Sequence, residues 1–157
     1  MTFDRIDLKI LDILQHDATV PVARIADQVG LSQTPCWKRI QKHEETGVIR
    51  ARVALLDPQA IGLSLTVFVM VEAVAHTTQW RAEFLCVVDT LGPVRDVYRL
   101  AGGHDFMLRV VVPDMAAFDR FYKDLTARIR LRSMNSVFAL ETMRTTTALP
   151  LGDLMAG

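Results

Sequence analysis

Residues 25–49, IADQVGLSQTPCWKRIQKHEETGVI, predict two short helices joined by a tight turn. The first is expected over residues 22–29, and Gly30 can end it in the left-handed conformation that glycine adopts at little cost. The second is expected over residues 33–46 and is closed by Gly47. This arrangement is typical of a helix-turn-helix DNA-binding element.

The N-terminal cap of the second of these helices has two candidates. Ser32 can cap it with Pro35 inside the first turn, or Thr34 can cap it with Pro35 at the first helical position, where the missing N–H costs nothing. Upstream, an amphipathic helix is expected over residues 4–17, because apolar residues recur there at helical spacing.

After these three helices the hydrophobic pattern changes from helical to extended. Residues 48–56 predict a strand or wing, and a connector follows over residues 57–62. We therefore divide the chain into three parts. These are a helix-turn-helix DNA-binding domain (residues 1–49), a hinge strand and linker (50–62) and a C-terminal domain (63–157).

The C-terminal part alternates strand and helix patterns in the order β-α-β-β-α-β. Strands are expected over residues 63–75, 94–101, 104–112 and 133–143, and helices over residues 78–91 and from residue 114. This order is typical of a ferredoxin-like domain, an α+β fold whose four-stranded antiparallel sheet carries both helices on one face. Since strand residues 65–71 and 107–112 are almost all apolar, a partner sheet is expected to cover the other face, which predicts at least a homodimer.

The composition favours a folded protein whose positive charge is local. Half of the 157 residues are apolar, and 18 Lys and Arg balance 18 Asp and Glu, but residues 32–52 hold five basic side chains against two acidic ones. The two cysteines, Cys36 and Cys86, lack the spacing of a zinc or redox site, which favours a reduced, cytoplasmic setting. With no N-terminal signal and no apolar run of about 20 residues, neither export nor a membrane span is expected.

Placing the third helix at about 100° per residue separates an inward stripe from an outward one. Cys36, Ile40 and His43 fall on the inward stripe, so Cys36 is interpreted as a small core residue and His43 as a buried neutral side chain. The outward stripe is polar and basic and is expected to face DNA, with Trp37 and Arg39 on its flanks. Its members are Thr34, Lys38, Gln41, Lys42 and Glu45.

The outward stripe offers groups for both phosphates and bases. Lys38 and Lys42 are expected to contact phosphates, which makes affinity dependent on salt. Gln33, Thr34 and Gln41 are expected to reach base edges in the major groove.

Alternatives remain open for parts of this helix. Free N–H groups at its start make Ser32 and Gln33 candidates for a further phosphate contact. Trp37 can pack against the preceding helix or lie along the groove wall. A merely solvated polar face would also explain the stripe from residue types alone.

Over nearly its whole length the chain resembles the leucine-responsive regulatory protein and AsnC family of transcription regulators. The resemblance lies in the order and spacing of residues 7–14, 29–40, 47–49, 54–58, 101–110 and the tail TTTALPL at 145–151. Within the family, TPCWKR (34–39), VALLDP (53–58), FYK (121–123) and FALE (138–141) resemble a branch that includes cysteine-responsive regulators.

The resemblance implies that the protein is a transcription regulator that binds double-stranded DNA. It also implies a homodimer that can assemble further into an octamer. The DNA-contacting residues it implies are Ser32, Gln33, Thr34, Trp37, Lys38, Arg39, Gln41 and Lys42.

The turn AGGHDF, residues 101–106, is a candidate amino-acid site. A free amino acid needs N–H donors for its carboxylate and an acceptor for its ammonium group, and a Gly-rich turn followed by an acid offers both. In the resembling family this loop lies between dimers and takes part in effector binding. The implied effector-binding residues are Ala101, Gly102, Gly103, His104 and Asp105, with Asp105 on the ammonium group, the two glycine backbones on the carboxylate and His104 beside the side chain.

The chain departs from the family pattern at several positions. An acid is common where Gly103 stands, and Tyr or Phe where His104 stands, so the effector is open, with cysteine and leucine as candidates. The Pro-Gly pair common before the last strand is missing from residues 129–133. Arg128, Arg130 and Arg132 are expected to form a solvated surface, with anion or DNA contact as the alternative.

Catalysis finds no support in the sequence. His76, His104, Asp105 and Asp114 form no recognisable motif of nucleophile, base and orienting group, and neither a phosphate loop nor a metal-ligand pair is present, so no cofactor is expected. Two alternatives to a DNA-binding regulator remain. One is a metabolite-binding or enzymatic module whose N-terminal helices serve only assembly, and the other is a thiol sensor acting through Cys36.

Overall fold

The computed structural model describes residues 3–155 and divides into two units by its internal contacts. Of the described residues, the first unit holds 3–54 and 144–155, and the second holds 55–143. The predicted C-terminal domain ran to the end of the chain, whereas residues 144–155 belong with the N-terminal helices.

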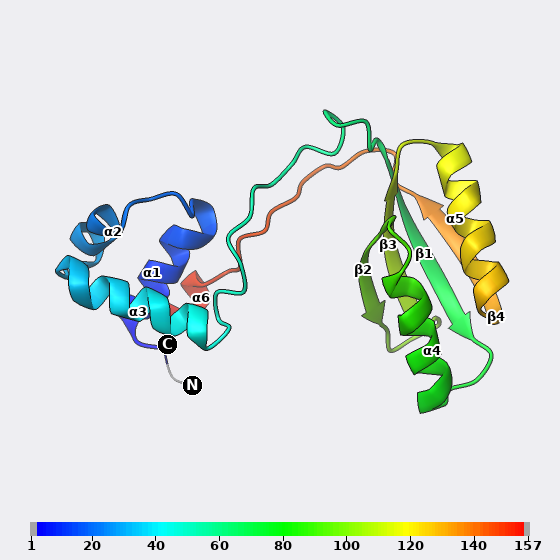
Figure 1. Cartoon of the computed structure of the whole chain (residues 1–157), viewed down its shortest axis with the longest axis horizontal. Coiled ribbons are helices and arrows are strands. Elements are labelled where there is room, and N and C mark those ends of the chain that lie inside the picture. The colour runs from blue at the N-terminus through cyan, green and yellow to red at the C-terminus, as the bar shows by residue number, and fades with distance from the viewer. Residues whose placement is uncertain (1–2, 156–157) are drawn as a thin grey trace. The chain divides into compact units, whose positions relative to one another are not determined.

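The first unit is built on three helices, α1 (Arg5–His16), α2 (Val22–Val29) and α3 (Gln33–Glu45), shown in blue to cyan in Figure 1. Their apolar positions recur at helical spacing and meet in one core, as the sequence predicts. The buried residues of this core are Ile10, Leu14, Ile25, Ala26, Cys36 and Ile40.

The turn between α2 and α3 depends on Gly30. Its φ of 73° lies in the left-handed region, where a Cβ is disfavoured, and the N–H of Leu31 then donates to the carbonyl of Ala26 at 2.9 Å. Ser32 is the N-cap of α3, so Thr34 is not, but the Ser32 side chain makes no capping hydrogen bond.

Asp4 caps α1 through a reciprocal pair of hydrogen bonds with Asp7. The Asp7 N–H donates to the Asp4 carboxylate at 2.7 Å, and the Asp4 N–H donates to the Asp7 carboxylate at 3.2 Å. The backbone N–H of Asp7, and next the guanidinium of Arg39, hold the pKa of Asp4 below its usual value.

Asp4→Ala is expected to lower the free energy of unfolding of the helical unit by about 1 kcal/mol at neutral pH, because it removes the cap. Since the pKa of Asp4 is lowered in the folded state, its stabilisation is present above the unfolded pKa and is lost as pH falls through the folded pKa. Urea unfolding of both proteins between pH 7 and about pH 2 should therefore show a shrinking difference. A difference that stays constant over this range would contradict the assignment.

The strand or wing predicted over residues 48–56 is absent, and this prediction was wrong for the single chain. Val53, Leu55 and Leu56 are 72%, 71% and 69% exposed. An extended segment becomes a strand only when another strand pairs with its N–H and C=O groups, and no described strand of the chain pairs with this one.

The second unit contains the predicted β-α-β-β-α-β order. Its elements are β1 (Leu65–Ala73), α4 (Thr78–Asp89), β2 (Val94–Arg99), β3 (Phe106–Val112), α5 (Met115–Arg128) and β4 (Leu131–Phe138). The strands form one antiparallel sheet in the order β2-β3-β1-β4, which confirms the ferredoxin-like arrangement.

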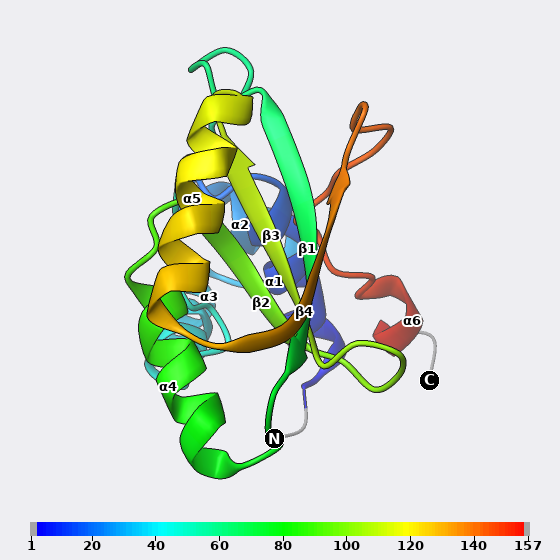
Figure 2. The ribbon, with the colours of Figure 1, turned by 90° about the vertical axis from the view of Figure 1, so that its right-hand side faces the viewer.

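Both helices of this unit lie on the same face of the sheet (Figure 2). On β1, Val67, Val69 and Val71 are fully buried against them, together with Phe84 of α4 and Leu125 of α5. The alternate residues of β1 point to the other face, as the two-residue period of a strand requires. That face carries the partly exposed side chains of Phe68, Met70, Tyr98, Met107 and Arg109.

The last strand was predicted over residues 133–143 but spans Leu131–Phe138. Its pairing with β1 ends where Phe138 lies opposite Val67 and the N–H of Ala139 donates to the carbonyl of Thr66. Beyond Ala139 only Leu65 of β1 remains, so the following residues have no strand to pair with and no regular structure, although their sequence favours extension.

The C-terminal segment packs on α1 within the first unit. The Gln15 side-chain amide donates to the carbonyl of Leu149 at 3.0 Å and accepts from its N–H at 2.8 Å. A short helix, α6 (Gly152–Met155), follows and was not predicted. Over residues 3–155, none of the helices has the length and apolar character needed to span a bilayer.

Candidate DNA-binding and effector sites

The outward side of α3 presents the predicted DNA-contacting residues to solvent. Exposed side chains are those of Ser32, Gln33, Thr34, Trp37, Lys38 and Lys42, while Gln41 and Arg39 are partly exposed. The opposite side carries the buried Cys36, Ile40 and His43, so the predicted division of the helix into two stripes is confirmed as burial.

The charges of residues 32–52 are not equally available. Arg39 donates to Asp4 at 2.6 Å and to Asp7 at 2.7 Å, which raises the pKa of its guanidinium, mainly through Asp4. Arg52 forms an ion pair with Glu44 at 2.8 Å. The three remaining basic side chains have no ion-pair partner among residues 3–155: Lys38, Lys42 and Arg50.

The start of α3 offers free backbone donors beside these cations. Because the Ser32 hydroxyl makes no capping bond, the N–H groups of Gln33 and Thr34 have no partner in the described part of the chain. Unpaired N–H groups at a helix N-terminus, together with the helix dipole, favour an anion such as a DNA phosphate.

Trp37 is 47% exposed on the flank of this surface. About half of the residue is therefore covered by the protein and half is open to a partner. This exposure is compatible with both roles considered from the sequence, packing against the preceding helix and contact along a groove wall.

His43 and Asp7 form a buried contact that sequence periodicity did not predict. His43 is 3% exposed, and its Nε2 lies 3.2 Å from the carboxylate of Asp7, to which Arg39 also donates. A neutral imidazole with its proton on Nε2 can make this bond, while its buried Nδ1 has no hydrogen-bond partner. The contact joins α3 to α1, so His43, Arg39 and Asp7 help to fix the position of α3 on α1.

The two cysteines differ in access. Cys36 is fully buried and burial raises the pKa of its thiol, whereas Cys86 on α4 is exposed. Reactivity requires both the thiolate form and access, so the structure favours Cys36 as a packing residue.

In the native protein, Cys86 is therefore expected to react rapidly with a disulfide reagent such as dithionitrobenzoate. Cys36 is expected to react at least about 100-fold more slowly, because the reagent reaches it only when the helical unit opens locally. The Cys86→Ser variant should lose the fast phase. Fast labelling that survives in Cys86→Ser would contradict the burial of Cys36.

At the turn between β2 and β3, Asp105 is tied into the sheet. Its Oδ2 accepts from the N–H of Ala73 at 2.8 Å, its own N–H donates to Val71, and its carbonyl accepts from Leu100. The Ala73 contact lies at the irregularity in the β1–β4 pairing. Asp105 thus has a structural task that the sequence did not indicate, which leaves Oδ1 for other contacts.

Two further ionisable residues, His76 and Glu72, lie at this turn and were not predicted as site residues. Nδ1 of His76 is 3.4 Å from Oδ1 of Asp105, and Nδ1 of His104 is 3.5 Å from Glu72 and lacks a hydrogen bond although buried. Glu72 is the one acid in an otherwise largely apolar strand, and this unusual position in the sequence could have indicated a functional residue. Only the pairing of β1 with β3 brings it beside the turn.

The glycines of the turn are exposed together with Ala101, and Gly102 has a positive φ of 156°. A cavity beside His76 measures about 30 Å³, which is about the volume of one water molecule. One subunit therefore does not enclose an amino acid at that point. Across residues 3–155 no group of three or more His, Cys, Asp or Glu side chains is arranged to hold a metal ion.

The fold and these two sites define a helix-turn-helix DNA-binding protein with a ferredoxin-like second domain. Residues 3–42 match the AsnC-type helix-turn-helix domain, and residues 66–149 match the Lrp/AsnC ligand binding domain. The chain belongs to the Lrp/AsnC family of transcriptional regulators, which confirms the family resemblance. It is thus a DNA-binding transcriptional regulator with an effector-binding domain.

Similar proteins support this assignment over nearly the full length. The glutamate uptake regulatory protein of Zymomonas mobilis is 44% identical over 150 residues, which cover 96% of this chain and 92% of that protein. The crystal structure of an AsnC family regulator from Agrobacterium tumefaciens has 51% identity and a TM-score of 0.92, covering 97% of this chain and 99% of that one. A Neisseria meningitidis regulator in complex with L-methionine has 32% identity and a TM-score of 0.90, covering 98% and 99%.

Proposed function

We propose that α3 lies in the major groove of double-stranded DNA with Lys38 and Lys42 on phosphates and Gln33, Thr34 and Gln41 at base edges. The observation that carries this proposal is that Lys38 and Lys42 have no ion-pair partner among the described residues and lie on an exposed helix whose opposite side is core. Phosphate contacts position such a helix, and base-edge contacts supply the sequence preference. This target places the proposed activity in the cytoplasm, and it requires no catalytic step.

In this proposal, the main role of Arg39 is structural and not a phosphate contact. Since its guanidinium already bridges Asp4 and Asp7, it holds α3 against α1 and leaves at most part of its donor set for DNA. Trp37 and Ser32 complete the proposed surface at its edges.

The proposed functional unit is a homodimer formed through the open face of the sheet. Phe68, Met70, Met107 and Tyr98 give this face an apolar centre, and Arg109 pairs with Asp96 beside it. A two-fold dimer presents two α3 helices, which matches half-sites separated by one or more turns of DNA. The octamer is the larger assembly of the same unit.

The proposed effector is an amino acid held at the turn of residues 101–105 and enclosed by a second subunit. Oδ1 of Asp105 suits its ammonium group, the N–H groups of Gly102 and Gly103 suit its carboxylate, and His104 borders its side chain. Cysteine and leucine were candidates from the sequence, and relatives that regulate glutamate uptake or bind L-methionine add glutamate and methionine.

The effector proposal is tested by thermal shift of the full chain with each amino acid. A ligand that binds only the folded state stabilises it by about 2.7 kcal/mol at 100 times its dissociation constant. The shift should vanish in Asp105→Asn, which keeps an oxygen for the Ala73 N–H but removes the charge that holds the ammonium group. Asp119→Asn, an exposed acid on α5, is the control and should keep the shift. Loss in both variants, or no shift with any amino acid, would refute the proposed site.

DNA reading is tested by selecting binding sites from random duplex DNA at moderate salt, followed by footprinting. We expect enrichment of a site with half-sites about 34–36 Å apart or a multiple of this. Binding with no sequence preference would favour the alternative in which the N-terminal helices serve only assembly.

A further inference from the structure

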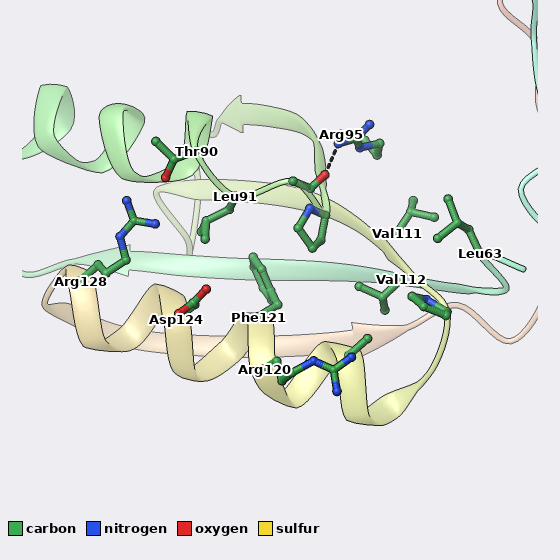
Figure 3. A pocket seen from close by; sticks show the side chains of 14 residues that line it. Leu63, Thr90, Leu91, Arg95, Val111, Val112, Arg120, Phe121, Asp124 and Arg128 are labelled. Atoms are coloured by element: carbon green, nitrogen blue, oxygen red, sulfur yellow. Dashed lines mark hydrogen bonds between the residues drawn. The ribbon is translucent and has the colours of Figure 1, made fainter.

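A groove of about 570 Å³ lies at the end of the sheet opposite the residue 101–105 turn. It is formed by the end of α4, the start of β2, the end of β3 and one side of α5 (Figure 3). Because β2 begins here at Val94 and ends at Arg99 before the turn, the strand separates this groove from the proposed effector site. The volume is within the range of about 300–1,000 Å³ found for small-molecule sites.

The floor of the groove is apolar and well ordered by packing. Leu91, Val112 and Phe121 are 6%, 1% and 3% exposed, yet each of them also lines the groove. They belong to the core shared by the sheet and both helices. The buried floor fixes the shape of the groove, and partly exposed lining residues such as Leu63 and Pro93 offer apolar surface that a hydrocarbon group can cover.

The rim of the groove carries unpaired charges at helical spacing. Arg120, Asp124 and Arg128 follow one another at four-residue intervals on α5, and among the described residues none of them makes a side-chain hydrogen bond or ion pair. On the neighbouring stripe of the same helix, Lys123 and Asp119, also four residues apart, do form an ion pair, at 2.5 Å. Neighbours of opposite charge at this spacing ordinarily attract each other, so it is the groove side that is left without partners.

Two of the unpaired groups face the groove. Figure 3 shows the side chains of Arg128 and Asp124 directed toward the gap between α5 and the end of α4, where Thr90 lies. From the start of β2, Arg95 adds a third cation, whose guanidinium donates to the Gly92 carbonyl. Three arginines and one aspartate give the rim a formal charge of +2.

We propose that this groove is a binding site for a small organic anion. Arg128 binds its carboxylate or phosphate group, because a guanidinium donates two parallel hydrogen bonds to such oxygens, and Arg120, two helical turns away on the same rim, adds positive charge. The hydrocarbon part of the ligand lies over Pro93 and the exposed edges of Leu91 and Phe121. This is a second ligand site, independent of the amino-acid site at the turn.

The test is calorimetric titration of the full chain with glutarate, hexanoate, hexyl phosphate and inorganic phosphate. At least one organic anion should bind saturably, and the carboxylate and phosphate ester arms decide which head group is preferred. Arg128→Gln should weaken this binding about tenfold or more, since it removes a charge-assisted hydrogen bond, and Arg120→Gln should weaken it by a smaller factor through the loss of rim charge. Both side chains are exposed, so melting temperatures that match the wild type are expected.

Two control variants sharpen the outcome. Arg132→Gln removes an exposed arginine of β4 that does not line the groove, and Asp105→Asn alters the turn at the other end of the sheet. Both should bind the anion as the wild type does. The proposal is overturned if no organic anion binds, if inorganic phosphate binds as tightly as every organic anion, or if either control loses binding as the groove variants do.

Discussion

The double substitution Lys38→Ala and Lys42→Ala is expected to weaken specific DNA binding by at least about 100-fold at moderate salt. Neither lysine has an ion-pair partner among the described residues, so each ammonium group is available for one phosphate, and a hydrogen bond to a charged group contributes about 1.5–3 kcal/mol. Because the proposed dimer loses two phosphate contacts in each subunit, the slope of log affinity against log salt concentration should also fall by about 3.6. The measurement is a salt series of fluorescence anisotropy titrations with the selected operator.

Lys9→Ala is the matched control for this variant. Lys9 is exposed in the same unit, on α1, and is outside the proposed surface of α3. Its loss should leave both the affinity and the salt slope nearly unchanged. If Lys9→Ala weakens binding as much as the double variant does, then the contact is a general charge effect and α3 is not the DNA-reading helix.

Phe84→Ala is expected to lower the free energy of unfolding of the sheet domain by about 3–5 kcal/mol. The ring is fully buried, stacks on Trp80 with centroids 5.2 Å apart and lies 4.8 Å from Phe106, so truncation leaves a cavity between α4 and the sheet. Much of the stability of a typical domain would be lost. Urea unfolding in a Trp37→Phe background, where Trp80 is the remaining tryptophan, reports on this unit alone.

Leu85→Ala provides the comparison on the next residue of the same helix. Leu85 is 39% exposed and lies off the buried face, so its truncation should cost below about 1 kcal/mol. Equal destabilisation by the two variants would mean that α4 does not pack on the sheet in the described orientation.

The helical and sheet patterns were accessible to sequence reasoning because each depends on local spacing. Cys36, Ile40 and His43 share one side of α3 by their separation alone, and the structure buries all three. Residues 48–56 show the limit of this reasoning, because the extended pattern cannot reveal whether another strand is present to pair with it. The end of β4 was missed for the same reason, since its length is set by the start of β1.

The sequence was less informative about which residues the charged side chains contact. Arg39 was grouped with the DNA-contacting residues, but the distance from α3 to α1 places it on Asp4 and Asp7, residues far from it in the sequence. Arg128 was expected on a solvated surface and is exposed, but only the packing of α4 beside α5 shows that it also lies on the rim of a groove. Glu72 reaches the residue 101–105 turn only through the register of two strands.

Local chemistry in the chain was therefore sufficient for the helix-turn-helix, the ferredoxin-like order and the outward side of α3, because hydrophobic periodicity and turn residues act over a few positions. The tertiary structure decided which charges on that side stay free, what Asp105 holds in place and where a second groove opens. These depend on contacts between residues distant in sequence, at distances of a few ångströms that no local pattern encodes. The reading helix is thus recognisable from residues 25–49, whereas its available charges are set by α1 and by the fold around it.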